Sequence, residues 1–153
     1  MIITFVGHSH LEKTDEILSG IKKCIIDNIE AVEKEERIFF YCGGYGDFDE
    51  ICRNVCCELK KEFKNSETVF ITPYITLEYQ KKIESFLRQG AYDSVIYPEL
   101  EKVPLKFAIN ERNKWMINKA DLVIAYVNVE YGGAYKALKF AQSRNKNIIN
   151  LGV

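Results

Sequence analysis

The sequence predicts an α/β fold built on a mostly parallel β-sheet, and two features support this prediction. Short runs of β-branched and aromatic residues alternate with longer segments in which apolar residues recur every three or four positions. This alternation is typical of a doubly wound sheet with helices on both faces. The chain has 153 residues, 47% of them hydrophobic, so we expect residues 1–153 to form a single domain.

The first half of the chain predicts two strand–helix units. An apolar run at residues 2–6 ends at Gly7, as a buried strand does before a turn. Thr14 has the side chain of an N-cap and precedes isoleucines spaced four residues apart, which predict a helix with one apolar face. The charged segment 33–37 is typical of a solvated helix end. The second strand is predicted at 37–42 and the second helix at 48–63.

The second half continues the same alternation. Pro73 and Pro98 end two predicted strands, and Gly90 follows a predicted helix. Pro104 lies near the start of another helix, where a residue without an amide proton is tolerated. The predicted strands are 68–71, 94–97, 121–127 and 147–151, and the predicted helices are 77–88, 104–119 and the segment that Gly132-Gly133 opens.

Three glycine-containing loops follow predicted strands and should meet at one edge of the sheet. In open parallel sheets, ligands bind beyond the carboxyl ends of the strands, where glycines and helix N-termini expose backbone amides to anions. The first loop alone is more typical of an ordinary turn, whereas the second has more glycines than a turn needs. The third begins a helix without a polar N-cap side chain. The residues concerned are Gly7, His8 and Ser9; Gly43, Gly44, Tyr45 and Gly46; and Tyr131, Gly132, Gly133 and Ala134.

Two carboxylates follow the second loop, which is unusual for a site that holds only phosphate. Asp47 and Asp49 would repel a phosphate if both faced it, so we expect one to cap the helix and the other to meet sugar hydroxyls or act as a base. The tandem Gly132-Gly133 is then the better phosphate site. These assignments predict a pocket with phosphate at one side and sugar at the other.

Composition argues against several other classes of protein. The net charge of −1 lacks the basic excess that drives binding to a nucleic-acid backbone, so we expect nucleic acid to be an unlikely partner. No signal peptide or membrane-spanning stretch is apparent, and we expect a cytoplasmic protein without a membrane partner. Five cysteines suit a reducing compartment. Cys52 with Cys56, and His8 with His10, lack further ligands, so no metal is expected.

Several segments resemble the uncharacterised bacterial YpsA-like proteins. The resemblance covers nearly the whole chain and lies in TFVGHSH, FYCGGYGDFD, YDSVIYPELEKVP, FAINERNKWMINKADLVIAYV, YGGAYKALKFA and NIINL. These proteins are similar to the wider SLOG superfamily, which includes the DprA/Smf DNA-processing proteins and the LOG phosphoribohydrolases. The resemblance implies a three-layer Rossmann-like fold with a doubly wound, mostly parallel sheet. Superfamily members often self-associate, which implies a possible homodimer.

LOG enzymes cleave the N-glycosidic bond of a nucleoside monophosphate, and their motifs match this chain in part. Arg112 resembles the family arginine, Asn113 stands where lysine is usual, and Gly132-Gly133 resemble the PGGxGT loop. Tyr131 replaces the proline of that loop, and the catalytic glutamate after it is missing. Asp47, Asp49 and Glu111 are candidate substitutes, because this chemistry needs a carboxylate near the anomeric carbon.

The sequence therefore favours binding of a nucleotide or nucleotide-derived small molecule, such as an ADP-ribose-like ligand, by a sensor or carrier without a cofactor. Arg112 is expected to contact a phosphate held at Gly132-Gly133, or alternatively to form a surface ion pair. Trp115 is expected to pack in the core rather than stack on a base, while Tyr126 and Tyr131 border the presumed pocket. The alternative function is hydrolysis or transfer at the N-glycosidic bond of a nucleoside or its monophosphate. A DprA-like module that contacts single-stranded DNA is a third, less favoured hypothesis.

Overall fold

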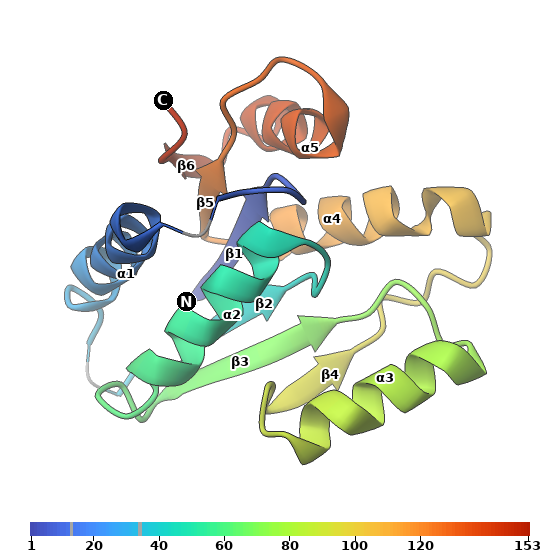
Figure 1. The fold of residues 1–153 in the computed structure, drawn as a ribbon, viewed down its shortest axis with the longest axis horizontal. Coiled ribbons are helices and arrows are strands. Elements are labelled where there is room, and N and C mark those ends of the chain that lie inside the picture. Colours follow the sequence, from blue (N-terminus) through green and yellow to red (C-terminus); the bar gives the residue numbers. More distant parts are fainter. Residues whose placement is uncertain (13, 34) are drawn as a thin grey trace.

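The computed structural model describes residues 1–12, 14–33 and 35–153, and it confirms the predicted α/β fold. The described residues form a six-stranded parallel sheet with the order β4-β3-β2-β1-β5-β6 (Figure 1). The strands are β1 (Ile2–Gly7), β2 (Ile38–Cys42), β3 (Ser66–Ile71), β4 (Ser94–Ile96), β5 (Leu122–Tyr126) and β6 (Asn147–Asn150). The helices are α1 (Asp15–Ile29), α2 (Asp47–Leu59), α3 (Leu77–Arg88), η1 (Leu105–Phe107), α4 (Ala108–Lys119) and α5 (Gly132–Ser143).

The helices form the two outer layers of a Rossmann-like three-layer fold. Alternate residues of β1 face opposite layers, as the pleat of a strand requires. Ile3 and Phe5 pack with α1 and α2, whereas Val6 packs with α4 and α5. Ile83 and Phe86 of α3 join the first of these layers. Figure 1 shows α2 in front of the sheet and α4 behind it.

Some helix ends agree with the predicted ones and others differ by several residues. Thr14 is the N-cap of α1, as predicted, and its hydroxyl accepts a hydrogen bond from the Ile17 amide at 3.2 Å. The second helix ends at Leu59 instead of residue 63, although Phe63 still packs against the core from the following turn. Pro104 precedes the short η1 turn, and α4 begins only at Ala108. Lys34, within the predicted solvated segment 33–37, lies outside the described residues.

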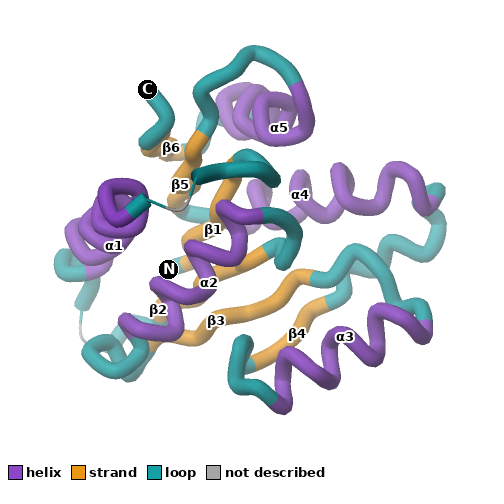
Figure 2. The backbone as a smooth tube through the Cα atoms, viewed as in Figure 1, coloured by secondary structure: helices purple, strands orange, loops and turns teal. Residues whose placement is uncertain are grey.

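The order in which the chain adds strands to the sheet reverses between β1 and β5. The chain adds strands outward from β1 through β2 and β3 to β4, then crosses back through α4 to place β5 on the other side of β1. Such a switch point leaves a crevice at the carboxyl ends of the strands, where α/β proteins bind ligands. In Figure 2 the loops that leave β1, β2 and β5 gather near this edge.

No helix of the described residues is both long and apolar enough to cross a lipid bilayer.

Candidate functional site

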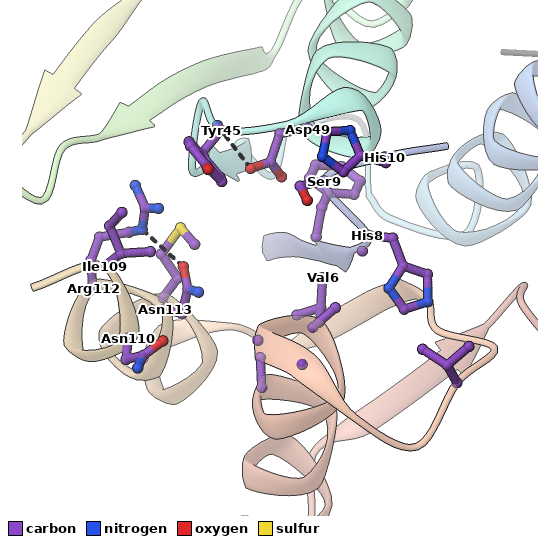
Figure 3. A pocket seen from close by; sticks show the side chains of 18 of the residues that line it. Val6, His8, Ser9, His10, Tyr45, Asp49, Ile109, Asn110, Arg112 and Asn113 are labelled. Carbon is purple, nitrogen blue, oxygen red and sulfur yellow. Dashed lines mark hydrogen bonds between the residues drawn. The ribbon is translucent and has the colours of Figure 1, made fainter. Parts of the chain in front are cut away.

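A cavity of about 520 Å³ lies at the switch point, between the loops that follow β1, β2 and β5 and the N-terminal half of α4. Its volume falls within the range of small-molecule sites, roughly 300–1,000 Å³. Figure 3 labels side chains around it that come from the end of β1 and its loop, from the loop after β2 with the start of α2, and from α4. The lining residues are Phe5, Val6, Gly7, His8, Ser9, His10, Tyr45, Asp49, Ile109, Asn110, Arg112, Asn113, Met116, Asn128, Val129, Tyr131, Gly132, Gly133, Ala134 and Ala137.

The loop after β1 forms one wall of the cavity and is tied to the start of α2. The amide of Asp47 donates to the Ser9 carbonyl at 2.9 Å, and the Asp47 carboxylate accepts from the Leu11 amide at 2.9 Å. Gly7 is required for close packing, because a Cβ there would lie 2.2 Å from the Phe48 ring. Asp47, predicted as a catalytic candidate, does not line the cavity: its carboxylate holds this loop in place.

The glycines of the loop after β2 lie close to neighbouring segments of the protein. Gly44 has a φ of +68°, and a Cβ on it would lie 2.3 Å from the Phe70 ring. Gly46 has a φ of +92° and passes so close to Ser9 that a Cβ would lie 2.6 Å from its Cα. Gly43, Gly44 and Gly46 are not among the lining residues, whereas Tyr45 is. Glycine is needed at Gly44 and Gly46 because a side chain there would collide with a neighbouring segment and because both have a positive φ.

Asp49 lies in the first turn of α2 and lines the cavity. Its Oδ2 accepts a hydrogen bond from the Tyr45 amide at 3.1 Å, which fixes the loop that carries Tyr45 (Figure 3). Burial among protein atoms raises the pKa of Asp49 to about 6, although the nearby Arg112 guanidinium and the Tyr45 hydrogen bond both act to lower it. Asp49 is therefore a carboxyl group that can hold or release a proton near neutral pH.

Arg112 is a cationic side chain held almost wholly inside the protein, with 2% of its surface exposed. Its Nη1 donates to the carbonyls of Gly43 at 2.6 Å and Ile71 at 2.9 Å, and its Nε donates to Asn113 Oδ1 at 2.9 Å (Figure 3). Burial lowers the pKa of Arg112, with Asp49 as the strongest opposing influence. Among the described residues no carboxylate forms an ion pair with it, so the predicted alternative of a surface ion pair does not apply.

Gly43 allows Asp49 and Arg112 to approach the same point. A Cβ on Gly43 would lie 3.1 Å from Asp49 Oδ2 and 3.2 Å from both Cζ and Nη2 of Arg112. Among the described residues, Nη2 has no protein acceptor, while Nε and Nη1 are both occupied. One edge of the guanidinium thus remains available to an acceptor in the cavity.

The N-terminus of α5 faces the cavity with its backbone exposed. Tyr131 is the N-cap residue, and its side chain makes no capping hydrogen bond. Gly132 has a φ of +88°, and a Cβ on Gly132 or Gly133 would meet nothing within 4 Å. The first amides of a helix carry partial positive charge and have no partner inside the helix. This terminus can therefore receive an anion.

His8 connects the first and third loops across the cavity. Its Nε2 accepts a hydrogen bond from the Asn128 amide at 3.1 Å, which assigns the ring proton to Nδ1 in the neutral tautomer. Sequence patterns did not predict Asn128 as a site residue, nor Ile109, Asn110 and Met116, although all four line the cavity. Asn128 is the second residue after β5, and its place after that strand was the available signal.

Glu111 and Trp115 lie on other faces of α4. Glu111, a predicted catalytic candidate, is outside the cavity and accepts from Lys114 Nζ at 3.3 Å, because its helical position turns it away from the sheet. Trp115 stacks on Tyr41 with ring centroids 5.7 Å apart, which agrees with packing rather than base stacking. Tyr126 packs against Phe48 with centroids 6.2 Å apart. Among the described residues, no group of three His, Cys, Asp or Glu side chains is placed to hold a metal ion.

Two solved structures share this fold. DNA processing protein A from Helicobacter pylori, described as having a unique single-stranded DNA binding mode, aligns with a TM-score of 0.65 and 17% identity. The alignment covers 98% of this chain but 64% of that protein, so this chain spans somewhat less than two thirds of its length. The structural-genomics target TM1055 aligns with a TM-score of 0.54 and 14% identity, over 96% of this chain and 71% of the other.

At these identities the comparisons establish the fold that the three proteins share. No protein-family model matches the chain. A search of curated proteins also gives no match.

Proposed function

We propose that this chain binds a nucleotide or nucleotide-derived small molecule in the switch-point cavity, as a member of the SLOG superfamily. The observation that carries the proposal is the meeting of Arg112 with the exposed N-terminus of α5 in one cavity. A phosphate at Gly133 would receive backbone amide hydrogen bonds and the favourable end of the helix dipole. The buried guanidinium adds a full positive charge to the same space.

The remaining walls suit the sugar and base of such a ligand. Asp49 and Ser9 supply hydrogen-bonding groups for hydroxyls, and Tyr45 and Tyr131 supply aromatic surface at the rim. Tyr45 is 59% exposed and Tyr131 is 74% exposed, so both rings are free to cover a base. The YpsA-like resemblance, the cytoplasmic location and the homodimer remain predictions that accompany this proposal.

A matched pair of glycine substitutions tests the phosphate position. Gly133→Asp places a carboxylate beside the proposed phosphate, while an acidic residue in a first helical turn still favours the helix. Gly20→Asp makes the same change in α1, where a Cβ also meets nothing within 4 Å. By titration calorimetry we expect AMP to bind the wild type and the Gly20 variant alike. The Gly133 variant should bind AMP about tenfold more weakly, a loss of about 1.4 kcal/mol.

Equal AMP affinity in all three proteins would show that the phosphate does not bind at Gly133. Absence of binding and of any thermal shift across AMP, GMP, CMP, UMP and ADP-ribose would overturn the proposal, because any ligand of the native state must raise its stability.

N-glycosidic hydrolysis is the second candidate, and Asp49 favours it. A carboxyl group with a pKa near 6 inside a ligand-sized cavity suits proton transfer near neutral pH. Chromatography of the same AMP incubations distinguishes the two functions, since hydrolysis releases adenine and binding alone does not.

Single-stranded DNA is a third candidate, supported by the description of the Helicobacter pylori protein. That likeness weakens the prediction that nucleic acid is an unlikely partner, although the net charge of −1 still argues against extended phosphate contacts. Competition between AMP and a short oligonucleotide would show whether a base of the strand enters the same cavity.

A further inference from the structure

A second, smaller hollow adjoins the switch-point cavity in the groove between α4 and α5, and we call it the interhelical hollow. Its volume is about 270 Å³. Four of its residues also line the main cavity, so the two spaces adjoin at a shared border. The border residues are Asn110, Asn113, Gly133 and Ala137.

The border has polar side chains on α4 and small residues on α5. Two carboxamides from α4 supply hydrogen-bonding groups, while Gly133 and Ala137 on α5 leave the helix backbone accessible. Gly133 is also the proposed phosphate position, so the phosphate would lie between the two hollows instead of at the end of one. A ligand with phosphate in its middle therefore has room for an arm on each side.

The interhelical hollow is lined by residues that suit the aromatic base and the negative charge of a second nucleotide. Phe107 and Phe140 contribute aromatic surface, and Phe107 is 47% exposed. Lys114 and Lys136 contribute positive charge, and Glu111 also lines the hollow. The Glu111 carboxylate is paired with Lys114, whose Nζ lies 3.3 Å from it and 5.7 Å from the Phe140 ring centroid. Within the described part of the chain, Lys136 has no carboxylate at ion-pair distance. One lysine thus remains available for a ligand anion.

We propose that the interhelical hollow is a second subsite, and that the preferred ligand is a dinucleotide whose phosphates cross the border at Gly133. This inference rests on the proposed function, because it takes the phosphate position from it. One nucleoside occupies the main cavity, and the ring of the other packs against Phe107 and Phe140. Lys136 neutralises part of the pyrophosphate charge from the α5 side.

A graded ligand series tests this subsite by titration calorimetry. AMP occupies the main cavity alone, ADP adds a second phosphate, and diadenosine pyrophosphate adds the second nucleoside. We expect the wild type to bind diadenosine pyrophosphate at least fivefold more tightly than ADP. In Phe107→Ala this advantage should fall to less than twofold, while AMP affinity stays within twofold of the wild type.

The charge of the subsite is tested by Lys136→Met, with Lys139→Met as the matched control. Lys139 belongs to the same helix, but its Nζ lies 5.7 Å from the Tyr135 ring centroid, and it does not line the hollow. The Lys136 variant should weaken ADP and diadenosine pyrophosphate several-fold and leave AMP within twofold. The Lys139 variant should change none of the three.

The outcomes separate this inference from the proposed function. If AMP binds and diadenosine pyrophosphate binds no better than ADP, or if both aromatic and lysine variants leave the series unchanged, the second subsite is overturned alone. If none of the three ligands binds the wild type, both proposals fall.

Discussion

At the residue scale, Asp49 is a carboxyl group in the cavity whose pKa is raised by its surroundings. Its pKa of about 6 lies above the ordinary value of 3.8, so the native state binds this proton more tightly than the unfolded chain does. Linkage then requires the contribution of Asp49 to stability to fall as the pH rises from about 4 to about 6 and to stay level above that. The ionised carboxylate is thus tolerated at neutral pH at a cost in stability.

Asp49→Asn should remove this pH dependence. The amide oxygen of Asn can still accept the hydrogen bond from the Tyr45 amide, but the side chain no longer titrates. We expect the stability of the wild type relative to the variant to fall between pH 4 and pH 7. The fall should be at most about 3 kcal/mol, at about 1.4 kcal/mol per pKa unit, because the cavity leaves the carboxyl partly hydrated. Urea unfolding of both proteins across this range measures it, and parallel curves would contradict the assignment.

Sequence patterns predicted some residues that line the cavity and others that do not. Arg112, Ser9 and Gly133 were named from loop position and motif, and all three line the cavity. Asp47 and Glu111 were named from residue type, but Asp47 holds the first loop and Glu111 lines the interhelical hollow instead of the main cavity. Residue type alone does not say which segment a carboxylate meets, because its partner can be distant in the chain. The hydrogen bond that the Leu11 amide donates to Asp47 spans such a distance.

At the element scale, the loop after β2 is shaped by what surrounds it. Its three glycines suggested a ligand cradle, yet the segments packed around them account for two of the three. Gly44 lies against Phe70 of β3, and Gly46 lies against the loop after β1. Strand and helix positions follow from apolar spacing, which is local. Packing between β2, β3 and the first loop depends on strand order, which no local pattern contains.

Gly44 and Gly90 separate backbone strain from crowding. Their φ values are +68° and +70°, but a Cβ on Gly90 meets nothing within 4 Å, whereas one on Gly44 collides with the Phe70 ring. Gly90→Ala should therefore lose about 1 kcal/mol of stability from its left-handed backbone. Gly44→Ala should lose a further ~1–3 kcal/mol from overpacking.

Urea midpoints with unchanged m-values measure both losses. Equal destabilisation by the two substitutions would mean that Phe70 moves aside without cost, and the loop would then need glycine only for its backbone angle.

At the scale of the whole molecule, the site depends on the reversal of strand order at β1. The order β4-β3-β2-β1-β5-β6 brings the loops after β1 and β5 together, although more than a hundred residues separate them in the chain. The bond between His8 and the Asn128 amide joins these loops directly. The alternation of strands and helices predicted a parallel sheet with a ligand edge, but the lining of the cavity and its border with the interhelical hollow depend on side chains from several separate segments.

Hydrogen exchange can test whether these segments act as one site. Binding of AMP should slow exchange at the amides of residues 8–10, at Tyr45 and at residues 128–134, since all of them line or border one cavity. The turns at the opposite edge of the sheet, residues 60–65 and 143–146, should exchange at unchanged rates. Those turns open by local fluctuations that a ligand at the carboxyl edge does not restrain.

In Gly133→Asp, AMP at the same concentration should give much less protection at all three cavity segments together, because their ordering depends on one bound phosphate. Protection confined to a single loop, or protection that appears equally at both edges of the sheet, would show that the three loops do not share a ligand.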